Sequence, residues 1–198
     1  MQYENELDQS FWNTCWENNQ TGWDIGLASP AISAYMAQYA NKNAAILIPG
    51  CGNAHEAEYL LHNGFTNITL IDIAIKAVAL LKEKYDKNPK VNIILSDFFE
   101  HQGKYDLIIE QTFFCAISPS LRKNYVQKSA SLLNIEGRII GLLFNTVFEK
   151  QGPPFGGGTN EYKTIFETNF IIKKMEECYN SIKPRANREI FINLIKKQ

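Results

Sequence analysis

Short apolar runs alternate with helical patterns through most of this 198-residue chain, and this alternation limits the possible folds more than any other feature. The apolar runs predict strands at 44–48, 68–71, 91–95, 106–109 and 138–144, and the intervening patterns predict helices at 30–40, 54–62, 74–85 and 118–133. Strands and helices in strict succession indicate a parallel sheet that helices cover on both faces.

The C-terminal part of the chain breaks this alternation. After a short helical pattern at 160–167, two strand patterns at 170–172 and 189–195 are separated only by a polar loop around Lys183, Pro184 and Arg185. Two strands without an intervening helix pair antiparallel. We therefore predict an α/β fold with a seven-stranded, mostly parallel sheet and an antiparallel C-terminal hairpin.

No internal repeat or linker divides the chain, so residues 1–198 are expected to form one domain. Residues 1–28 are polar, yet they hold all three tryptophans of the protein, Trp12, Trp16 and Trp23. Disordered segments are poor in aromatic residues. We interpret residues 1–28 as a lid that buries its aromatic rings against a core formed by residues 29–198.

Charge and cysteine usage argue against several classes of protein. The chain has 20 basic and 21 acidic residues and a net charge of −1, whereas proteins that bind nucleic-acid backbones usually carry a basic excess. No apolar run approaches the ~18 residues of a membrane span, and the polar N-terminus lacks the features of a signal peptide. The four cysteines include no C-x-x-C pair, and the three histidines have no metal-type spacing. We expect a cytoplasmic monomer without a metal and without a nucleic-acid or membrane partner.

The strongest local signal is the pair Gly50 and Gly52, which follows the strand at 44–48 and precedes a helix. Glycine lacks a Cβ, so the backbone can approach a ligand there, and open α/β sheets bind ligands at the carboxyl ends of strands. The dinucleotide fingerprint G-x-G-x-x-G is incomplete, because His55 stands where the third glycine would be. We therefore favour a ligand without a pyrophosphate; the alternative is a tight turn that binds nothing.

Acidic residues follow the next two strands. Asp72 lies about 20 residues after Gly50, the distance at which an acid binds both ribose hydroxyls of a nucleoside, although it could instead cap the following helix. Asp97 and Phe98 follow the third strand and are suited to the amino group and ring of adenine, or else simply begin a loop. The pair Glu110-Gln111 follows the fourth strand. The fold is expected to bring these strand ends together.

Sequence motifs accompany this site: F-W-x-x-x-W at 11–16, G-W-D-I-G at 22–26, I-P-G-C-G-N at 48–53, F-F-C-A-I at 113–117 and G-P-P-F at 152–155. In combination they resemble the thiopurine S-methyltransferase family of class I S-adenosylmethionine-dependent methyltransferases. The last two are most similar to its plant halide/thiol methyltransferase branch. The resemblance extends from about residue 10 to the C-terminal hairpin. It implies a Rossmann-like fold, S-adenosylmethionine as methyl donor, S-adenosylhomocysteine as product, and a small-molecule acceptor that is a soft nucleophile.

The same resemblance implies roles for individual residues. The implied donor-binding residues are Trp12, Trp16, Trp23, Gly50, Gly52, Asp72, Ile73, Asp97, Phe98 and Gln111. The acceptor-side candidates are Gln111, Phe114, Cys115 and Phe155, and the alternative for Cys115 is a small buried thiol. Residues 152–158 hold two prolines and four glycines after the fifth strand, and we interpret them from this composition as a flap over the acceptor pocket; the alternative is an ordinary surface loop. Gln111 is also the candidate catalytic residue, because it stands where the plant branch typically has a tyrosine near donor and acceptor. Because of this departure, the resemblance does not carry halide or thiocyanate specificity to this chain.

Methyl transfer from a sulfonium is an in-line displacement, so an ionised thiolate or a halide needs neither a general base nor a metal. Alignment of the reactants can supply as much as ~7–11 kcal/mol of barrier reduction, and a lid excludes water. Tryptophan faces attract a cation such as the sulfonium, by ~0.5–2 kcal/mol each. The alternative for the three tryptophans is plain core packing.

Other classes of function stay open as alternatives. A nucleic-acid methyltransferase would need a basic groove or a pocket for a flipped base, and an N/D-P-P-Y/F motif, where this chain has Glu110-Gln111-Thr112-Phe113. An NAD-dependent dehydrogenase would need the third glycine and a catalytic pair such as Tyr-x-x-x-Lys. A methyltransferase for another small molecule and a non-catalytic nucleoside-binding protein are the remaining alternatives.

Overall fold

The structure is a computed structural model that describes residues 7–150 and 152–198, so residues 1–6 of the predicted lid lie outside the described residues. The strands are β1 (Ile46–Pro49), β2 (Ile68–Asp72), β3 (Val91–Leu95), β4 (Tyr105–Gln111), β5 (Leu133–Phe144), β6 (Phe170–Glu177) and β7 (Glu189–Lys196). The helices are α1 (Gln9–Glu17), α2 (Pro30–Ala37), α3 (His55–His62), α4 (Ile75–Lys84), α5 (Arg122–Leu132) and α6 (Thr159–Phe166), with 3-10 turns η1 (Pro119–Leu121) and η2 (Lys183–Arg185). Each predicted strand and helix is present.

The seven strands form one sheet in the order β3-β2-β1-β4-β5-β7-β6. Strands β1 to β5 are parallel, and β7 pairs antiparallel with both β5 and β6. The predicted sheet is therefore confirmed, with β7 inserted between β5 and the edge strand β6. The strand order reverses between β1 and β4, and open α/β sheets bind ligands at such a topological switch point.

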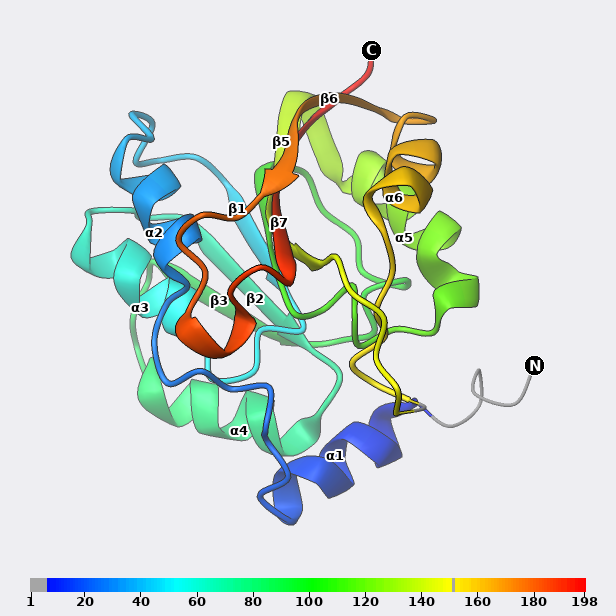
Figure 1. The fold of residues 1–198 in the computed structure, drawn as a ribbon. Helices are drawn as coiled ribbons and strands as arrows, with labels where there is room; N and C mark the ends of the chain where they lie inside the picture. Colours follow the sequence, from blue (N-terminus) through cyan, green and yellow to red (C-terminus); the bar gives the residue numbers. More distant parts are fainter. Residues whose placement is uncertain (1–6, 151) are drawn as a thin grey trace.

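Helices cover both faces of the sheet: Figure 1 shows α2, α3 and α4 on one side and α5 and α6 on the other. The side chains of β1 alternate between these layers. Leu47 packs in the cluster that contains Tyr125 of α5, whereas Ile46 and Ile48 pack in the cluster that contains Leu60 of α3. A strand that is buried on both faces must be apolar throughout, which explains the continuous apolar run before the glycine turn.

Two predicted strand boundaries were wrong by five residues: the start of β5, and the end of β6, which continues to Glu177 instead of ending at residue 172. Strand β5 begins at Leu133, directly after α5, rather than at residue 138, and Gly137 lies inside the strand. The pairing with β4 shifts register between Tyr105 and Leu107. A Cβ at Gly137 would lie 2.9 Å from the carbonyl oxygen of Asn134. Glycine therefore permits an irregular strand at a position that resembles a turn in the sequence.

The N-terminal segment (residues 7–28) is fixed to the core by polar side chains. Asn13 Oδ1 accepts a hydrogen bond of 2.8 Å from the amide of Lys76 in the first turn of α4. Beyond α1, Asp24 accepts a hydrogen bond from Asn53 Nδ2 and contacts Nε2 of His55 at 2.8 Å. Burial acts to raise the pKa of Asp24, but its hydrogen bonds lower it overall. These contacts hold the segment across the turn that follows β1.

Candidate active site

A cavity of about 1060 Å³ opens at the carboxyl edge of the parallel strands. Its walls come from the N-terminal segment, the residues that follow β1 to β4, the segment after β5 and the loop before β7. The lining includes the predicted residues Trp12, Trp16, Trp23, Gly50, Gly52, Asp72, Ile73, Asp97, Phe98 and Cys115. The sheet order divides the cavity into a β1 half, walled by the ends of β1, β2 and β3, and a β5 half, walled by the ends of β4 and β5 and the start of β7.

The two glycines after β1 bring the backbone to the cavity wall. Gly50 and Gly52 have φ values of +54° and +51°, in the left-handed region that is costly for other residues. The ring of Phe113 lies directly on Gly50, since a Cβ built there would overlap the ring. At Gly52 a Cβ would lie 3.6 Å from the ring of Trp16, which is an ordinary contact. Gly50 therefore packs against the residues after β4, and Gly52 lies beside the N-terminal segment.

Asp72 is the buried acid of the β1 half, with 9% of its surface exposed. Its Oδ2 accepts a hydrogen bond of 3.0 Å from the amide of Gly52, and its Oδ1 accepts one of 2.9 Å from the amide of Ala74. Burial raises the pKa of Asp72, and its backbone hydrogen bonds oppose the shift. Its backbone hydrogen bonds, which include one from Ile73, leave part of the lone-pair capacity of the carboxylate for a ligand hydroxyl. Asp72 therefore shapes the turn before α4 and also lines the cavity.

The three tryptophans form one cluster in the cavity wall. The ring centroids of Trp12 and Trp23 lie 5.6 Å apart, and those of Trp16 and Trp23 lie 6.1 Å apart, in edge-to-face arrangements. Trp16 is buried and the other two are half-buried, and the cluster packs on Ala74 and Ala77 at the start of α4. The cluster thus packs against the core and also lines the cavity.

Asp97 and Phe98 line the cavity after β3 in different ways. Asp97 is exposed, and its Oδ1 accepts a hydrogen bond of 2.8 Å from the amide of Phe99, as expected for a residue that begins a loop. Phe98 is buried and stacks on Tyr125, with ring centroids 5.3 Å apart. Most of its ring surface therefore belongs to the core.

Arg185 links the β5 half to the N-terminal segment. Its Nη2 donates a hydrogen bond of 2.7 Å to the carbonyl oxygen of Trp23. Its guanidinium carbon lies 5.4 Å from the ring centroid of Phe144, and its Nη1 lies 3.4 Å from Glu189 Oε1. The side chain is only 11% exposed. A mostly buried cation therefore lies where the loop before β7 meets the cavity.

The charged lining residues come from three parts of the cavity wall. Asp72 and Asp97 belong to the β1 half, Lys150, Arg185 and Arg188 belong to the β5 half, and Asp8 comes from the N-terminal segment. Cys115 lines the cavity beside these cations, and burial together with Glu110 raises the pKa of its thiol to about 12, against the effect of nearby arginines. The Cys115 side chain is therefore a neutral thiol at physiological pH.

Two predicted residues near β4 do not line the cavity. Phe114 is 1% exposed and packs edge-to-face against Tyr125 and Tyr162, so it belongs to the core. Gln111 pairs with Leu142 in the sheet, and its Oε1 is buried without a hydrogen-bond partner among the described residues. The structure does not bring Gln111 or Phe114 together with the other predicted residues.

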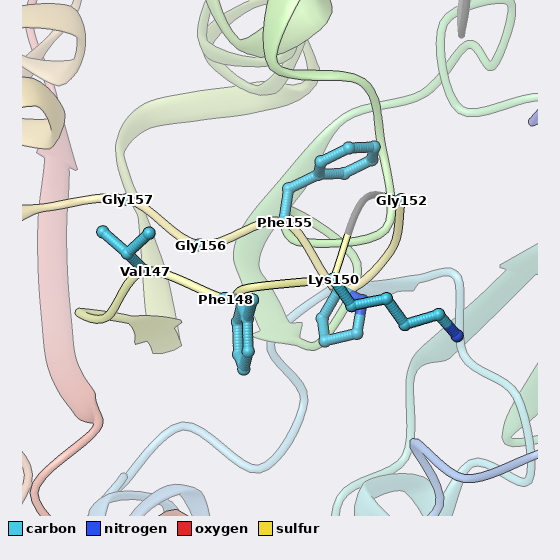
Figure 2. A pocket seen from close by; sticks show the side chains of 8 residues that line it. Val147, Phe148, Lys150, Gly152, Phe155, Gly156 and Gly157 are labelled. Carbon is cyan, nitrogen blue, oxygen red and sulfur yellow. The ribbon is translucent and has the colours of Figure 1, made fainter.

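Phe155 lines a second, smaller cavity of about 290 Å³ instead of the large one. Figure 2 shows the rings of Phe148 and Phe155 pointing to opposite sides of the segment that follows β5. Phe148, Lys150 and Pro154 line both cavities. The backbone amide of Phe155 nevertheless donates a hydrogen bond of 2.7 Å to the carbonyl oxygen of Cys115, so this segment is anchored at the large cavity.

Sequence reasoning missed the basic residues of the β5 half. Arg185 appeared only as part of a polar loop between two strands, and Lys150 and Arg188 gave no signal of their own. A topological signal was available, because a strand that is antiparallel to β5 begins at the edge where β5 ends. The loop before β7 must therefore reach the same edge as the glycine turn.

Over residues 7–150 and 152–198, no group of three or more His, Cys, Asp or Glu side chains is placed to hold a metal ion. None of the helices in these ranges combines the length and the apolar composition needed to cross a membrane.

Comparison with known proteins gives matches along almost the whole chain. Residues 7–197 match the family model described as thiopurine S-methyltransferase. The chain is 30% identical over 184 residues to probable thiol methyltransferase 2 of Arabidopsis thaliana, which covers 90% of this chain and 81% of the relative. It is 28% identical over 179 residues to the thiopurine S-methyltransferase of Vibrio campbellii, which covers 81% of this chain and 82% of the relative.

Solved structures share the fold at lower identity. One is the 1,6-didemethyltoxoflavin-N1-methyltransferase of Burkholderia thailandensis, solved with 1,6-didemethyltoxoflavin and S-adenosylhomocysteine bound. It superposes with a TM-score of 0.75 and 14% identity, over 96% of this chain and 87% of that chain. The fold is therefore that of class I methyltransferases, and the match over residues 7–197 shows that the chain belongs to the thiopurine S-methyltransferase family.

Proposed function

We propose that this protein transfers the methyl group of S-adenosylmethionine to a small soft nucleophile, a thiolate in the first place. The observation that carries the proposal is one cavity at the switch point of the sheet, with an acid and a glycine turn in its β1 half and basic residues in its β5 half. Membership of the thiopurine S-methyltransferase family supports the donor, and relatives named as thiol and thiopurine methyltransferases support a sulfur acceptor.

The residues of the β1 half fit an S-adenosyl nucleoside. The charged carboxylate of Asp72 suits the ribose hydroxyls, and Asp97 with the edge of Phe98 suits adenine. At Gly52 the turn leaves room for the methionine portion, because this glycine carries no Cβ, whereas the ring of Phe113 occupies the corresponding space at Gly50. When bound, S-adenosylmethionine supplies a methyl carbon on a positively charged sulfur, which leaves as a neutral thioether after in-line attack.

The tryptophan cluster suits the positive charge of the donor. Indole faces attract a cation by ~0.5–2 kcal/mol each, and most strongly where water is excluded. Trp16 lies beside Gly52, so the cluster covers the glycine turn. Arg185 binds the carbonyl oxygen of Trp23 and ties this cover to the β5 half. The N-terminal segment is thereby suited to align the two reactants and to keep water out.

The β5 half suits an anionic acceptor. Lys150, Arg185 and Arg188 raise the local concentration of anions and favour the ionised form of a thiol. An acceptor that is already ionised needs no general base from the protein. Cys115 lines the same wall, but its thiol is neutral, so it does not compete with the acceptor for the methyl group. The four cysteines are free thiols, which supports the expected cytoplasmic location.

Binding and turnover test the proposal separately. Calorimetric titration with S-adenosylmethionine, S-adenosylhomocysteine and NAD should give binding for the first two and none for NAD. A screen with methyl-labelled donor against bisulfide, aromatic thiols, a thiopurine, thiocyanate and iodide should then give volatile or extractable methylated product with at least one acceptor. Binding of NAD alone, or donor binding without product from any acceptor in the screen, would overturn the proposed function.

A further inference from the structure

Glu110 is a fully buried acid at the end of β4. Its Oε1 accepts hydrogen bonds of 2.9 Å and 2.8 Å from the amides of Phe113 and Phe114, and its Oε2 accepts one of 2.7 Å from the hydroxyl of Tyr125. On the neighbouring strand stands Gly141, where a Cβ would lie 2.7 Å from the Cβ of Glu110. One carboxyl group therefore joins the end of β4, the residues that follow it and helix α5.

The residues that this carboxyl group holds lie between the two halves of the cavity. Thr112 has φ +61°, an unfavourable conformation for a β-branched residue that its surroundings must maintain. Phe113 then lies on Gly50, and both Phe113 and Cys115 line the cavity. The carbonyl oxygen of Cys115 accepts the hydrogen bond from Phe155. Residues 112–115 thus connect the glycine turn to the segment that follows β5.

We infer that Glu110 is a positioning residue for methyl transfer: its ionised carboxyl group fixes residues 112–115 against Gly50 and so sets the β5 half of the cavity at the distance from the donor that in-line transfer requires. The kinetic consequence of this inference rests on the proposed function. The structural part, that the carboxyl group holds the turn, does not.

The protonation state of Glu110 changes how firmly the turn is held. Burial raises the pKa of Glu110 to about 7, against its three hydrogen bonds. The titratable groups that face it are Tyr125 on α5 and Cys115 on the turn, and both stay neutral when Glu110 ionises, because burial raises their pKa values. From β5 it faces Gly141. Hydrogen bonds to a carboxylate are roughly twice as strong as those to a neutral carbonyl, so the turn is held most firmly above the pKa of Glu110.

The buried hydroxyl of Ser129 lets the protonated form of Glu110 take part in the same hydrogen-bond network. Ser129 Oγ is buried and has no hydrogen-bond partner within residues 7–150 and 152–198. Burial raises the pKa of Tyr125, and the nearby Ser129 hydroxyl opposes that shift. When Glu110 is protonated and donates to the Tyr125 oxygen, the Tyr125 proton can turn toward Ser129 Oγ. The same three side chains can therefore hold either protonation state.

The structural part is tested by nuclear magnetic resonance of the protein without any acceptor. The backbone amide signals of Phe113 and Phe114 should shift together with a midpoint near the pKa of about 7, and these shifts should disappear in Glu110→Gln. Glu176→Gln removes an exposed carboxylate on β6 and is the matched control, which should leave both titrations unchanged. Amide signals that do not titrate, or that titrate equally in Glu110→Gln, would overturn the inference.

The kinetic part compares wild type and Glu110→Gln with an acceptor found in the screen. At each pH, the kcat of the wild type is divided by the kcat of Glu110→Gln. Ionisation of the acceptor affects both proteins equally, so it does not change this ratio. This ratio should rise by about fivefold as Glu110 ionises, while the dissociation constant of S-adenosylhomocysteine stays within about twofold. Glu110→Gln should retain more activity than Glu110→Ala, because the amide keeps an acceptor for the two backbone amides. Tyr125→Phe, which leaves those two bonds in place, should lie between wild type and Glu110→Gln above the pKa.

The outcomes separate the inference from the proposed function. If no acceptor is methylated, the proposed function fails and the amide titration alone decides whether Glu110 holds the turn. If product forms but the kcat ratio is flat or falls with pH, the positioning role is wrong and the proposed function stands. Should Glu110→Ala fail to fold, Glu110→Gln and Tyr125→Phe still decide the question, because both keep the volume of the side chain.

Discussion

Replacing Gly50 by alanine should damage both stability and donor binding, because the position combines a left-handed backbone with a close neighbour. At φ +54° an alanine costs about 1–2 kcal/mol. Its Cβ would also overlap the ring of Phe113. Forcing an extra carbon into a packed site adds about 1–3 kcal/mol. The free energy of unfolding should therefore fall by more than backbone strain alone explains, and the displaced Phe113 should disturb the cavity.

Gly52 is the matched control for this prediction. It has nearly the same φ, +51°, but a Cβ there would meet only Trp16 at 3.6 Å and Trp23 at 3.9 Å, which are ordinary contacts. Gly52→Ala should therefore lower the free energy of unfolding only by the cost of backbone strain, about 1–2 kcal/mol. At Gly158 no atom of the described part of the chain, apart from Gly158 and its two chain neighbours, would lie within 4 Å of a Cβ, so Gly158→Ala should change stability by less than about 0.5 kcal/mol.

Urea unfolding of the three variants measures the stability differences, and calorimetry with S-adenosylhomocysteine measures the effect on donor binding. We expect Gly50→Ala to be the least stable variant and to weaken binding by about tenfold or more, the equivalent of about 1.4 kcal/mol. Equal losses of stability for Gly50→Ala and Gly52→Ala would refute the argument, because they would show that contact with Phe113 has no energetic consequence.

Further predictions concern donor binding, acceptor binding and pH. Asp72→Asn should raise the dissociation constant of S-adenosylhomocysteine by about 10- to 100-fold, as measured by calorimetry, because ribose loses a charged hydrogen-bond acceptor; an unchanged constant would remove Asp72 from the site. Trp16→Ala should speed donor dissociation in stopped-flow fluorescence, and a variant that only melts at a lower temperature would favour pure core packing. Arg185→Gln should raise the KM of an anionic acceptor by about tenfold, and an unchanged KM would argue against the acceptor site in the β5 half. The raised pKa of Glu110 means that the folded state binds its proton more tightly, so its contribution to stability is present below about pH 4.5 and declines by about 3 kcal/mol as the pH rises through about 7. Glu110→Gln should remove this decline from urea unfolding curves, and identical pH dependence in both proteins would contradict it.

Much of the fold followed from the sequence because its strands are buried on both faces. The run that became β1 is apolar throughout, and its residues pack into both layers of the core. The glycine turn and Asp72 were recognisable because residue type and spacing define their geometry locally. Residues that follow successive parallel strands were expected to meet, and Gly50, Asp72 and Asp97 do line one cavity.

What could not be predicted depends on contacts between distant parts of the chain. Phe114 and Phe155 belong to sequence motifs that have other residues in the cavity wall, but packing sets the direction of each side chain. Phe114 points into the core, and Phe155 points toward the smaller cavity. Arg185 reaches the site only because β7 is inserted between β5 and β6. Glu110 looked like one more polar residue at a strand end, and its role depends on Tyr125, which lies on α5.

The most direct test of the account is a crystal structure of the protein with S-adenosylhomocysteine. We predict that the ribose lies on the carboxylate of Asp72, with the sulfur beneath the tryptophan cluster and the amino-acid portion over Gly52. The sulfur should also face the β5 half between Cys115 and Arg185. A nucleoside bound elsewhere, or a sulfur turned away from both the tryptophans and the basic residues, would contradict the proposed methyl transfer.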